Sequence, residues 1–230
     1  MTTLNNKVLM SWSSGKDSAY ALYKLKQLMH EFAVIGLLTT LTKPFDRTCI
    51  HGVRRKLLEA QAKHMGLMSY VVEIPYPCTA EAYESLMKTF LTTQAVSSNI
   101  SFIAFGDLFL EDVRHYRETK LATTAIQPLF PLWHENTQTL AHEIITAGFK
   151  AIVTCVDPKK LDISFVGRVF DESFLKDLPN GIDPCGEHGE FHTFVYDAPL
   201  FIKPINISVG EIIERDSFIF ADIILDQDCA

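Results

Sequence analysis

The chain has 230 residues, of which 47% are hydrophobic, and this composition is typical of a folded protein with a sizeable core. Its formal net charge of −7, without any run of lysine and arginine, argues against a general DNA- or RNA-binding protein. No apolar stretch approaches the roughly 18 residues of a membrane-spanning helix. With no signal peptide and five scattered cysteines that form no Cys-x-x-Cys pair, we expect a soluble, cytoplasmic protein with reduced thiols.

The first half of the chain predicts strands and helices in alternation. Apolar or β-branched runs predict strands at 8–12, 32–40, 70–74 and 101–105. Apolar residues three or four positions apart predict helices at 17–30, 54–66, 80–96 and 111–122, and 41–53 is expected to be a loop. Such alternation is typical of an α/β, Rossmann-like fold, in which helices cover both faces of a parallel sheet.

The pattern changes near residue 126, where Pro128 and Pro131 interrupt the alternation. We place a domain boundary there, so that 1–126 is a nucleotide-binding domain and 127–230 a smaller α+β C-terminal domain. The second part predicts a helix at 139–147 and strands, mostly antiparallel, at 151–156, 193–196, 205–207 and 218–225.

A turn of small and charged residues joins the first strand to the first helix, and we call it the phosphate turn. Its residues are Ser13, Ser14, Gly15, Lys16, Asp17 and Ser18. Backbone amides and a helix N-terminus suit a phosphate, Lys16 adds a positive charge, and Asp17 is a candidate Mg²⁺ ligand. The turn is not a Walker P-loop, because Asp follows the lysine and Met10 replaces the first glycine. The alternative is an ordinary strand–helix turn.

Other candidate ligands follow neighbouring strands, at the sheet edge where open parallel sheets bind ligands. Thr39 ends the second predicted strand and is a candidate adenosine contact, although threonine is common at strand ends. Gly106 follows the fourth strand and is expected to approach ATP, and Asp107 is a second candidate Mg²⁺ ligand.

Two arginines and a long loop complete the candidates of the first half. Arg114 and Arg117 are three residues apart on a helix, so they share a face that suits a phosphate or carboxylate. The alternative is an exposed helix with salt bridges. In the 41–53 loop and just beyond it, Gly52, Arg54 and Arg55 are candidates for contacting ATP phosphates, or else simply exposed residues.

The 183–193 segment concentrates two glutamates, two histidines and one cysteine within eleven residues. Four interpretations remain open: a zinc site through Cys185, His188 and His192, a cysteine nucleophile with a histidine base, a substrate-orienting loop, or a plain turn. The zinc interpretation is weakened because HGEFH is not the HExxH motif and Gly189 disfavours a helix there.

The phosphate turn, SSGKDS, resembles the SGGxDS loop of the PP-loop ATP pyrophosphatases, with Ser14 in place of a glycine, where a serine fits if its φ is negative. Together with DPCGEHGEFHTFVYDAPLF and GD…ED.R..R, it makes nearly the whole chain similar to the diphthine–ammonia ligase family. The resemblance implies an adenine-nucleotide α-hydrolase-like domain, a small C-terminal domain, and ATP-driven amidation of a carboxylate. In the founding activity that carboxylate belongs to the diphthine residue of a translation elongation factor, and ammonia is the nitrogen donor. Many members, particularly bacterial ones, sit in cells without diphthamide, so the acceptor is left open.

The implied chemistry has two steps. A carboxylate oxygen attacks the α-phosphorus of ATP to give an acyl-adenylate and pyrophosphate, and ammonia then displaces AMP. For this chemistry we expect Lys16 to neutralise charge, and Asp17 and Asp107 are candidate Mg²⁺ ligands. Arg114 and Arg117 are candidates for binding the acceptor carboxylate. The 183–193 segment supplies further residues. The candidate acceptor contacts are Asp183, Cys185 and Gly186, and the candidates for deprotonating ammonium are Glu187, Glu190 and His192.

Two rival functions remain, a nucleotide sensor without catalysis and a PP-loop tRNA-modifying or sulfur-transfer enzyme. The second would want a basic surface or a cysteine pair, and neither is visible in the sequence. Homo-oligomerisation is left open.

Overall fold

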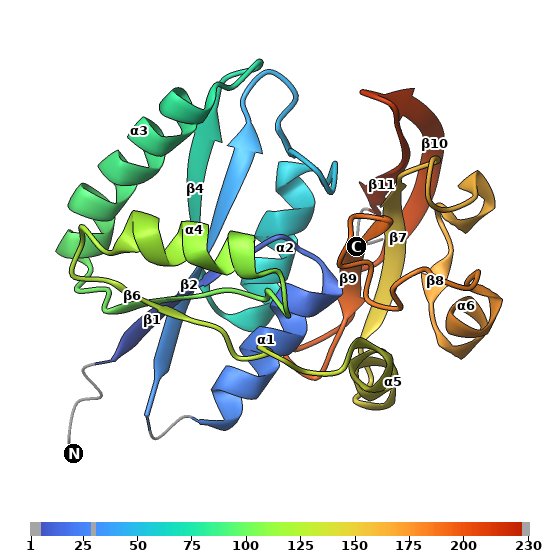
Figure 1. Ribbon diagram of the computed structural model, residues 1–230, viewed down its shortest axis with the longest axis horizontal. Coiled ribbons are helices and arrows are strands. Elements are labelled where there is room, and N and C mark those ends of the chain that lie inside the picture. Colours follow the sequence, from blue (N-terminus) through green and yellow to red (C-terminus); the bar gives the residue numbers. More distant parts are fainter. Residues whose placement is uncertain (1–5, 29–30, 227–230) are drawn as a thin grey trace.

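The computed structural model describes residues 6–28 and 31–226, which form two β-sheets with helices packed around them (Figure 1). The first unit contains, in chain order, β1 (Lys7–Ser11), α1 (Lys16–Gln27), β2 (Ala33–Thr42), β3 (Arg47–Thr48), α2 (Arg55–Met65), β4 (Met68–Ile74), α3 (Ala80–Phe90), the π-helical turn η1 (Leu91–Ala95), β5 (Phe102–Ala104), α4 (Glu111–Leu121) and β6 (Gln127–Leu129). The second unit contains α5 (Thr137–Thr146), β7 (Lys150–Val156), the 3₁₀ turn η2 (Ile163–Phe165), β8 (Val169–Phe170), α6 (Glu172–Asp177), β9 (Phe191–Asp197), β10 (Ile207–Arg215) and β11 (Phe218–Leu225).

The first sheet has the parallel order β4-β2-β1-β5-β6, and the short β3 pairs antiparallel with the end of β2. The α/β class predicted from the sequence is therefore confirmed. From β1 the chain builds outward through β2 and β4 on one side, and it later returns to place β5 and β6 on the other side. The strands β1 and β5 are neighbours, and the segments that follow them leave the sheet in different directions. Sheets of this kind bind ligands at that point, beyond the carboxyl ends of the strands.

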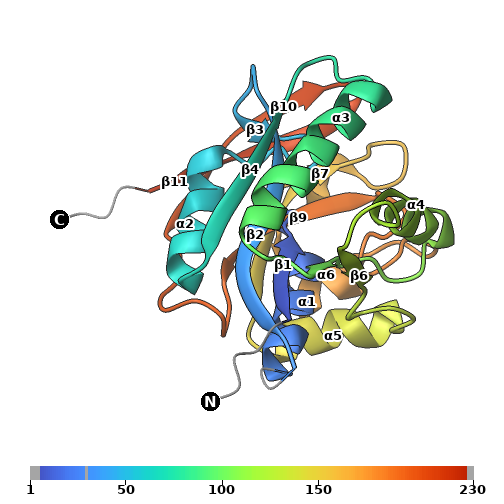
Figure 2. The same ribbon diagram turned by 90° about the vertical axis from the view of Figure 1, so that its left-hand side faces the viewer.

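Successive residues of β1 point to opposite faces of the first sheet and belong to different cores. Val8 and Met10 are fully buried in a cluster with residues of α1 and α2, whereas Leu9 packs in a second cluster with residues of α3, η1 and α4. Figure 2 shows α3 in front of the first sheet and the second sheet behind it. Both faces are covered, which explains why these strands read as nearly continuous apolar runs.

The second sheet is antiparallel, as predicted, and it packs against the side of the first unit that carries α1 and α2 (Figure 1). Its central strand β7 pairs with β9 along one edge and with β8 and β11 along the other. The apolar cluster that contains Val8 and Met10 continues into Phe170 and Phe194 of this sheet. The two units therefore share one core.

Several boundaries differ from the predictions. β6 adds to the first sheet, so the first unit extends beyond the expected boundary at 126. The strand expected at 205–207 begins only at Ile207 and runs to Arg215. A register shift between Val209 and Ile212 interrupts the alternation of side chains in this strand, so its full length could not be predicted from the sequence pattern. α6 was not predicted. The first helix ends at Gln27, and its expected last residues, 29–30, lie outside the described residues.

None of the helices within residues 6–28 and 31–226 is long and apolar enough to cross a membrane.

Candidate active site

The phosphate turn folds tightly between β1 and α1. The Ser13 Oγ atom lies 3.1 Å from the Ser18 Oγ atom, and the Ser18 hydroxyl donates to the Gly15 carbonyl at 3.0 Å. Helix α1 begins at Lys16 with Gly15 as its N-cap, and the cap itself makes no side-chain hydrogen bond, whereas the first helical amide, that of Lys16, donates to the Thr193 hydroxyl of β9. Gly106 closes the turn from β5, because a Cβ atom there would lie 2.9 Å from the Ser18 nitrogen.

Ser14 adopts a φ of +76°, in the left-handed region that glycine favours, so the expectation of a negative φ is wrong. The reason is that its carbonyl is committed to the second unit. It accepts hydrogen bonds from the Val195 amide at 3.0 Å and from the Gln61 side chain at 3.1 Å. The Ser14 hydroxyl is fully buried and has no hydrogen-bond partner among the described residues.

Lys16 is buried beneath the 183–193 segment, with 1% of the residue exposed. Its Nζ atom donates to Asp17 Oδ2 at 3.0 Å and to the carbonyl of Cys185, and it lies 5.1 Å from the ring centre of Phe191. Its backbone amide donates to the Thr193 hydroxyl at 3.1 Å. Burial lowers the pKa of Lys16, but the charge and hydrogen bond of Asp17 and the smaller effects of Cys185 and Glu187 together outweigh it, and the pKa is raised. Lys16 is therefore a fixed cation at the junction of the two units.

Carboxylates of three segments lie close enough to Glu187 to act on its charge. Burial raises the pKa of Glu187 to about 8, and the charge of Asp17 adds to this effect while Lys16 opposes it. Asp107 and Asp183 contribute in the same direction as Asp17. Burial also raises the pKa of Asp17, whose Oδ1 atom has no partner within the described part of the chain. Glu187 thus combines a carboxyl poised near neutral pH with a position beside the phosphate turn.

Other residues of the 183–193 segment shape the loop itself. Asp183 Oδ1 accepts from the Cys185 and Glu187 amides at 2.8 and 3.3 Å. Both carboxylate oxygens of the buried Glu190 accept backbone amides, those of Asp183 at 3.2 Å and His188 at 3.0 Å. Because these oxygens are already occupied, the geometry favours structural roles for Asp183 and Glu190 over the acceptor-binding and base roles expected from the sequence.

Cys185 and Gly186 also serve the loop. The buried Cys185 thiol donates to the Thr137 carbonyl at 3.3 Å, and burial raises its pKa, which disfavours the thiolate that a cysteine nucleophile needs. Gly186 has a φ of +72°, and a Cβ atom on it would lie 2.8 Å from the Phe191 carbonyl oxygen. Only glycine fits this close turn.

The two arginines of α4 lie on one face, as predicted, but both are engaged. Arg117 pairs with Asp107 through two hydrogen bonds of 2.5 and 3.2 Å, so Asp107 is less available to a cation than expected. Arg114 bonds to Glu118 at 2.8 Å and stacks 4.7 Å from the ring centre of Trp133. Both guanidinium groups remain partly exposed, with 34% and 28% of their side chains accessible.

The remaining sequence candidates have local partners. The Thr39 hydroxyl donates to the Trp12 carbonyl at 2.9 Å and so fixes the end of β1 against β2. Arg54 pairs with Asp222 of β11, and Arg55 pairs with Asp46 and Glu73. These ion pairs keep the arginines on the surface around the loop instead of pointing them at the phosphate turn.

Sequence reasoning missed two residues that hold the site together. Gln61 is fully buried: its Nε2 donates to the carbonyls of Ser14 and Val195, and its Oε1 accepts from the Trp12 indole at 2.8 Å. The His51 ring lies against Gly15, and its centre is 4.6 Å from that of His192. Gln61 could have been noticed in the sequence, because it is a polar residue on the otherwise apolar, buried face of α2.

The contacts described above limit which residues can hold a metal ion or the phosphates of ATP. Over residues 6–28 and 31–226, no three histidine, cysteine or acidic side chains are placed to hold a metal ion together, so the zinc interpretation through Cys185, His188 and His192 finds no support. A Mg²⁺ ion held mainly by ATP phosphates needs fewer protein ligands, and the unpartnered Asp17 Oδ1 suits that role. The unpartnered Ser14 hydroxyl likewise suits a phosphate ligand.

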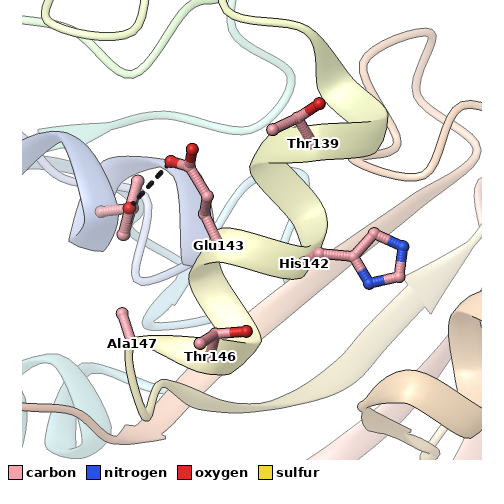
Figure 3. Close-up of a pocket in the computed structure, with 6 residues that line it drawn as sticks. Thr139, His142, Glu143, Thr146 and Ala147 are labelled. Carbon is pink, nitrogen blue, oxygen red and sulfur yellow. Dashed lines mark hydrogen bonds between the residues drawn. The ribbon is translucent and has the colours of Figure 1, made fainter.

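A surface groove of about 510 Å³ lies between α1 and α5 and contains none of the predicted site residues (Figure 3). Figure 3 shows Glu143 turned toward α1, while His142 points away from it. Glu143 accepts a hydrogen bond of 3.1 Å from the Tyr20 hydroxyl and lies 3.6 Å from the Lys24 ammonium. These contacts hold α5 against α1. The polar side chains that line the groove therefore have a structural role in helix packing, and no ligand is needed to explain them.

Comparisons with known proteins identify the family. Residues 6–120 match the model of the diphthamide synthase N-terminal domain, and residues 136–224 match that of the diphthamide synthase C-terminal domain. The curated proteins named diphthine–ammonia ligase from Bos taurus and Homo sapiens are each 25% identical over 231 residues, covering 92% of this chain and 86% of the relative. The protein of that name from Schizosaccharomyces pombe is 26% identical, and the match covers 92% of this chain but 38% of that relative.

A solved structure, the U34-tRNA thiolase NcsA from Methanococcus maripaludis, is 17% identical and covers 63% of this chain and 58% of its own, with a TM-score of 0.38 that is too low to support an argument. The family matches, in contrast, span both units of the fold and confirm the resemblance seen in the sequence. The chain therefore belongs to the diphthamide synthase family of ATP-dependent, amide-forming ligases.

Proposed function

We propose that this protein activates a substrate carboxylate with ATP and converts it to an amide with ammonia, as a diphthine–ammonia ligase does. A carboxylate oxygen attacks the α-phosphorus, which gives an acyl-adenylate and releases pyrophosphate. Ammonia then attacks the acyl carbon, AMP leaves with the bonding electron pair, and the nitrogen loses a proton. The proposed acceptor is diphthine on a protein, by analogy with the named relatives.

The observation that carries this proposal is the contact between the 183–193 segment and the phosphate turn. Lys16 donates to the Cys185 carbonyl through its side chain and to Thr193 through its amide, so residues of the second unit lie beside the ATP phosphate site. A binding module would need only the turn, whereas a ligase also needs groups for the acceptor and for ammonia next to the α-phosphate.

The residues where the two units meet would have different roles in the reaction. The phosphate turn would hold the leaving pyrophosphate, with Lys16 offsetting its charge. Mg²⁺, for which Asp17 is the favoured ligand, would neutralise phosphate charge when bound. Arg114 and Arg117, whose side chains are each about one-third exposed, suit the acceptor carboxylate.

Glu187 is the favoured base for the ammonium nitrogen. Its pKa of about 8 matches a group that must take a proton from ammonium near neutral pH. His192 is a weaker candidate, because burial holds its pKa well below the ordinary value and so makes it a poor base for ammonium. The sulfur-transfer alternative is disfavoured, because burial raises the pKa of Cys155 to about 12 and that of Cys185 as well.

The test is to supply the protein with ATP, Mg²⁺, ammonium chloride and a diphthine-bearing protein. We expect one AMP and one pyrophosphate for each amide formed. A Lys16→Met variant should lose pyrophosphate release, whereas Lys88→Met on α3 should keep it. Production of ADP, or pyrophosphate release that does not depend on any acceptor, would contradict the proposal. A cytoplasmic location and a homo-oligomeric state stay predictions.

A further inference from the structure

His51 lies in the loop of residues 43–54, which joins β2 to α2, and its ring packs against the phosphate turn. A Cβ atom on Gly15 would lie 2.8 Å from His51 Cε1, so the imidazole packs directly on the glycine backbone. The Nδ1 atom of His51 is 3.0 Å from the carbonyl oxygen of Thr193 on β9. Thr193 in turn accepts the Lys16 amide through its hydroxyl. One ring thus contacts both the turn and the strand that supports it.

The hydrogen bond to Thr193 determines where the His51 ring carries its proton. A carbonyl oxygen only accepts, so Nδ1 must be the donor. Burial lowers the pKa of His51 to about 4, which keeps the ring neutral near pH 7 and leaves Nε2 without a proton. His51 therefore acts through Nδ1–H and through its shape, and it brings no positive charge to the phosphates.

The second unit holds the 43–54 loop in place on both sides of His51. Arg47 Nη1 donates to the Gly52 carbonyl at 2.9 Å and to Asp222 Oδ1 of β11 at 2.8 Å. Gly52 fits tightly against Phe220, because a Cβ atom there would lie 2.7 Å from Phe220 Cδ1. With its loop anchored in this way, the His51 ring is presented to Gly15 in a fixed position.

We propose that His51 is a positioning residue for ATP, which holds the phosphate turn against β9 and so fixes the backbone amides of the turn in place beside the phosphates. The inference rests on the proposed use of residues 13–18 as the ATP phosphate site. His51 touches the turn's backbone and no reacting atom. Its loss should weaken ATP binding by misaligning those amides.

Three substitutions of His51 distinguish the contributions of its two ring nitrogens. Asparagine places an amide N–H near the Nδ1 position, whereas glutamine places it near the Nε2 position and alanine removes both. We expect the Kd for ATP with Mg²⁺, measured by titration calorimetry without any acceptor, to rise about tenfold in His51→Ala and His51→Gln. His51→Asn should stay within about threefold of wild type. Ile50→Ala, on the same loop and 56% exposed, is the matched control and should bind ATP normally.

A second readout does not depend on ATP. Nitrogen-15 spectra of the wild-type protein should show the His51 ring as a neutral Nδ1–H tautomer, and thermal melting should confirm that each variant is folded. The proposal is overturned if folded His51→Ala binds ATP like wild type, if asparagine fails to rescue, or if Nδ1 carries no proton. If wild type binds ATP but makes no amide, the proposed function fails while this inference stands. If wild type binds no ATP, both fail.

Discussion

Ser14 is the residue at which this chain departs from the glycine expected in its turn, and the structure shows the consequence. Its φ of +76° costs a non-glycine residue about 1–2 kcal/mol, and its buried hydroxyl has no described partner. The backbone conformation is imposed from outside, because the Ser14 carbonyl is bound by Gln61 and Val195.

Replacing Ser14 with glycine should therefore stabilise the protein. Glycine relieves the backbone strain and removes the unpaired hydroxyl, while its greater freedom in the unfolded chain offsets part of the gain. We expect the free energy of unfolding in urea to rise by about 1 kcal/mol. Ser13→Gly is the matched control and should be destabilising, because the Ser13 hydroxyl accepts the Gly15 amide. A Ser14→Gly protein no more stable than wild type would contradict the strain argument.

Glu187→Gln should slow amide formation in a pH-dependent way. The wild-type carboxyl acts as a base only after losing its proton, and its pKa is about 8. The ratio of wild-type to variant kcat/KM for ammonium should therefore rise as the pH passes upward through about 8 and reach roughly 100-fold. Glu111→Gln, exposed on α4, serves as control. A ratio that does not change with pH would remove Glu187 as the base.

At the level of elements, β11 and the 43–54 loop are joined by one carboxylate. Asp222 receives hydrogen bonds from Arg54 Nε at 2.9 Å and from Arg47 Nη1 at 2.8 Å. Hydrogen bonding to Arg54 and Arg47 lowers the pKa of Asp222 to about 2 despite its partial burial. The loop that carries His51 therefore depends on a charge of the second sheet.

Asp222→Asn should destabilise the protein by about 1–2 kcal/mol at pH 7, since two arginines lose their common partner. The folded-state pKa is depressed, so this stabilisation is complete above the unfolded value near 3.8 and is lost as the pH falls toward 2. The difference between wild type and variant in urea unfolding should shrink over that pH range. An equal difference at pH 7 and pH 2.5 would show that the ion pairs are not its source.

Most elements could be predicted from the sequence because their signals are local. The apolar spacing of Leu57, Leu58 and Ala62 places α2, and Gly66 ends it with a φ of +65°. The site is different, since its key contacts join distant residues: His51 and Thr193 are 142 positions apart, and Lys16 and Cys185 are 169 apart. Local patterns carry no information on which carbonyl such side chains meet. Glu190 illustrates this, because a reactive carboxylate and one bonded to two loop amides look identical in the sequence.

At the scale of the whole molecule, the two units share one hydrophobic core. The same apolar cluster contains Met10 of β1, Leu58 of α2 and Phe194 of β9. Separating the units would expose this core on both sides, at a cost of about 25 cal/mol for each Å² of apolar surface.

Thermal unfolding should therefore give a single transition. We expect one calorimetric peak whose van't Hoff enthalpy equals the measured enthalpy, and a fragment of residues 1–130 should not fold by itself. A Trp133→Phe variant would leave Trp12, which is 3% exposed, as the only tryptophan and let its fluorescence follow the same transition. Two resolved peaks would show that the units are independent domains.

Gln61 gives this junction an unusual tolerance to sequence change. Its amide donates to the backbone carbonyls of Ser14 and Val195, so this contact itself does not depend on the side chains at those two positions. The constraint falls on position 61 itself, because no other side chain of that length offers two N–H donors and an oxygen acceptor for the Trp12 indole. The Gln61 contacts can therefore keep the two units in register when the side chains that surround them change.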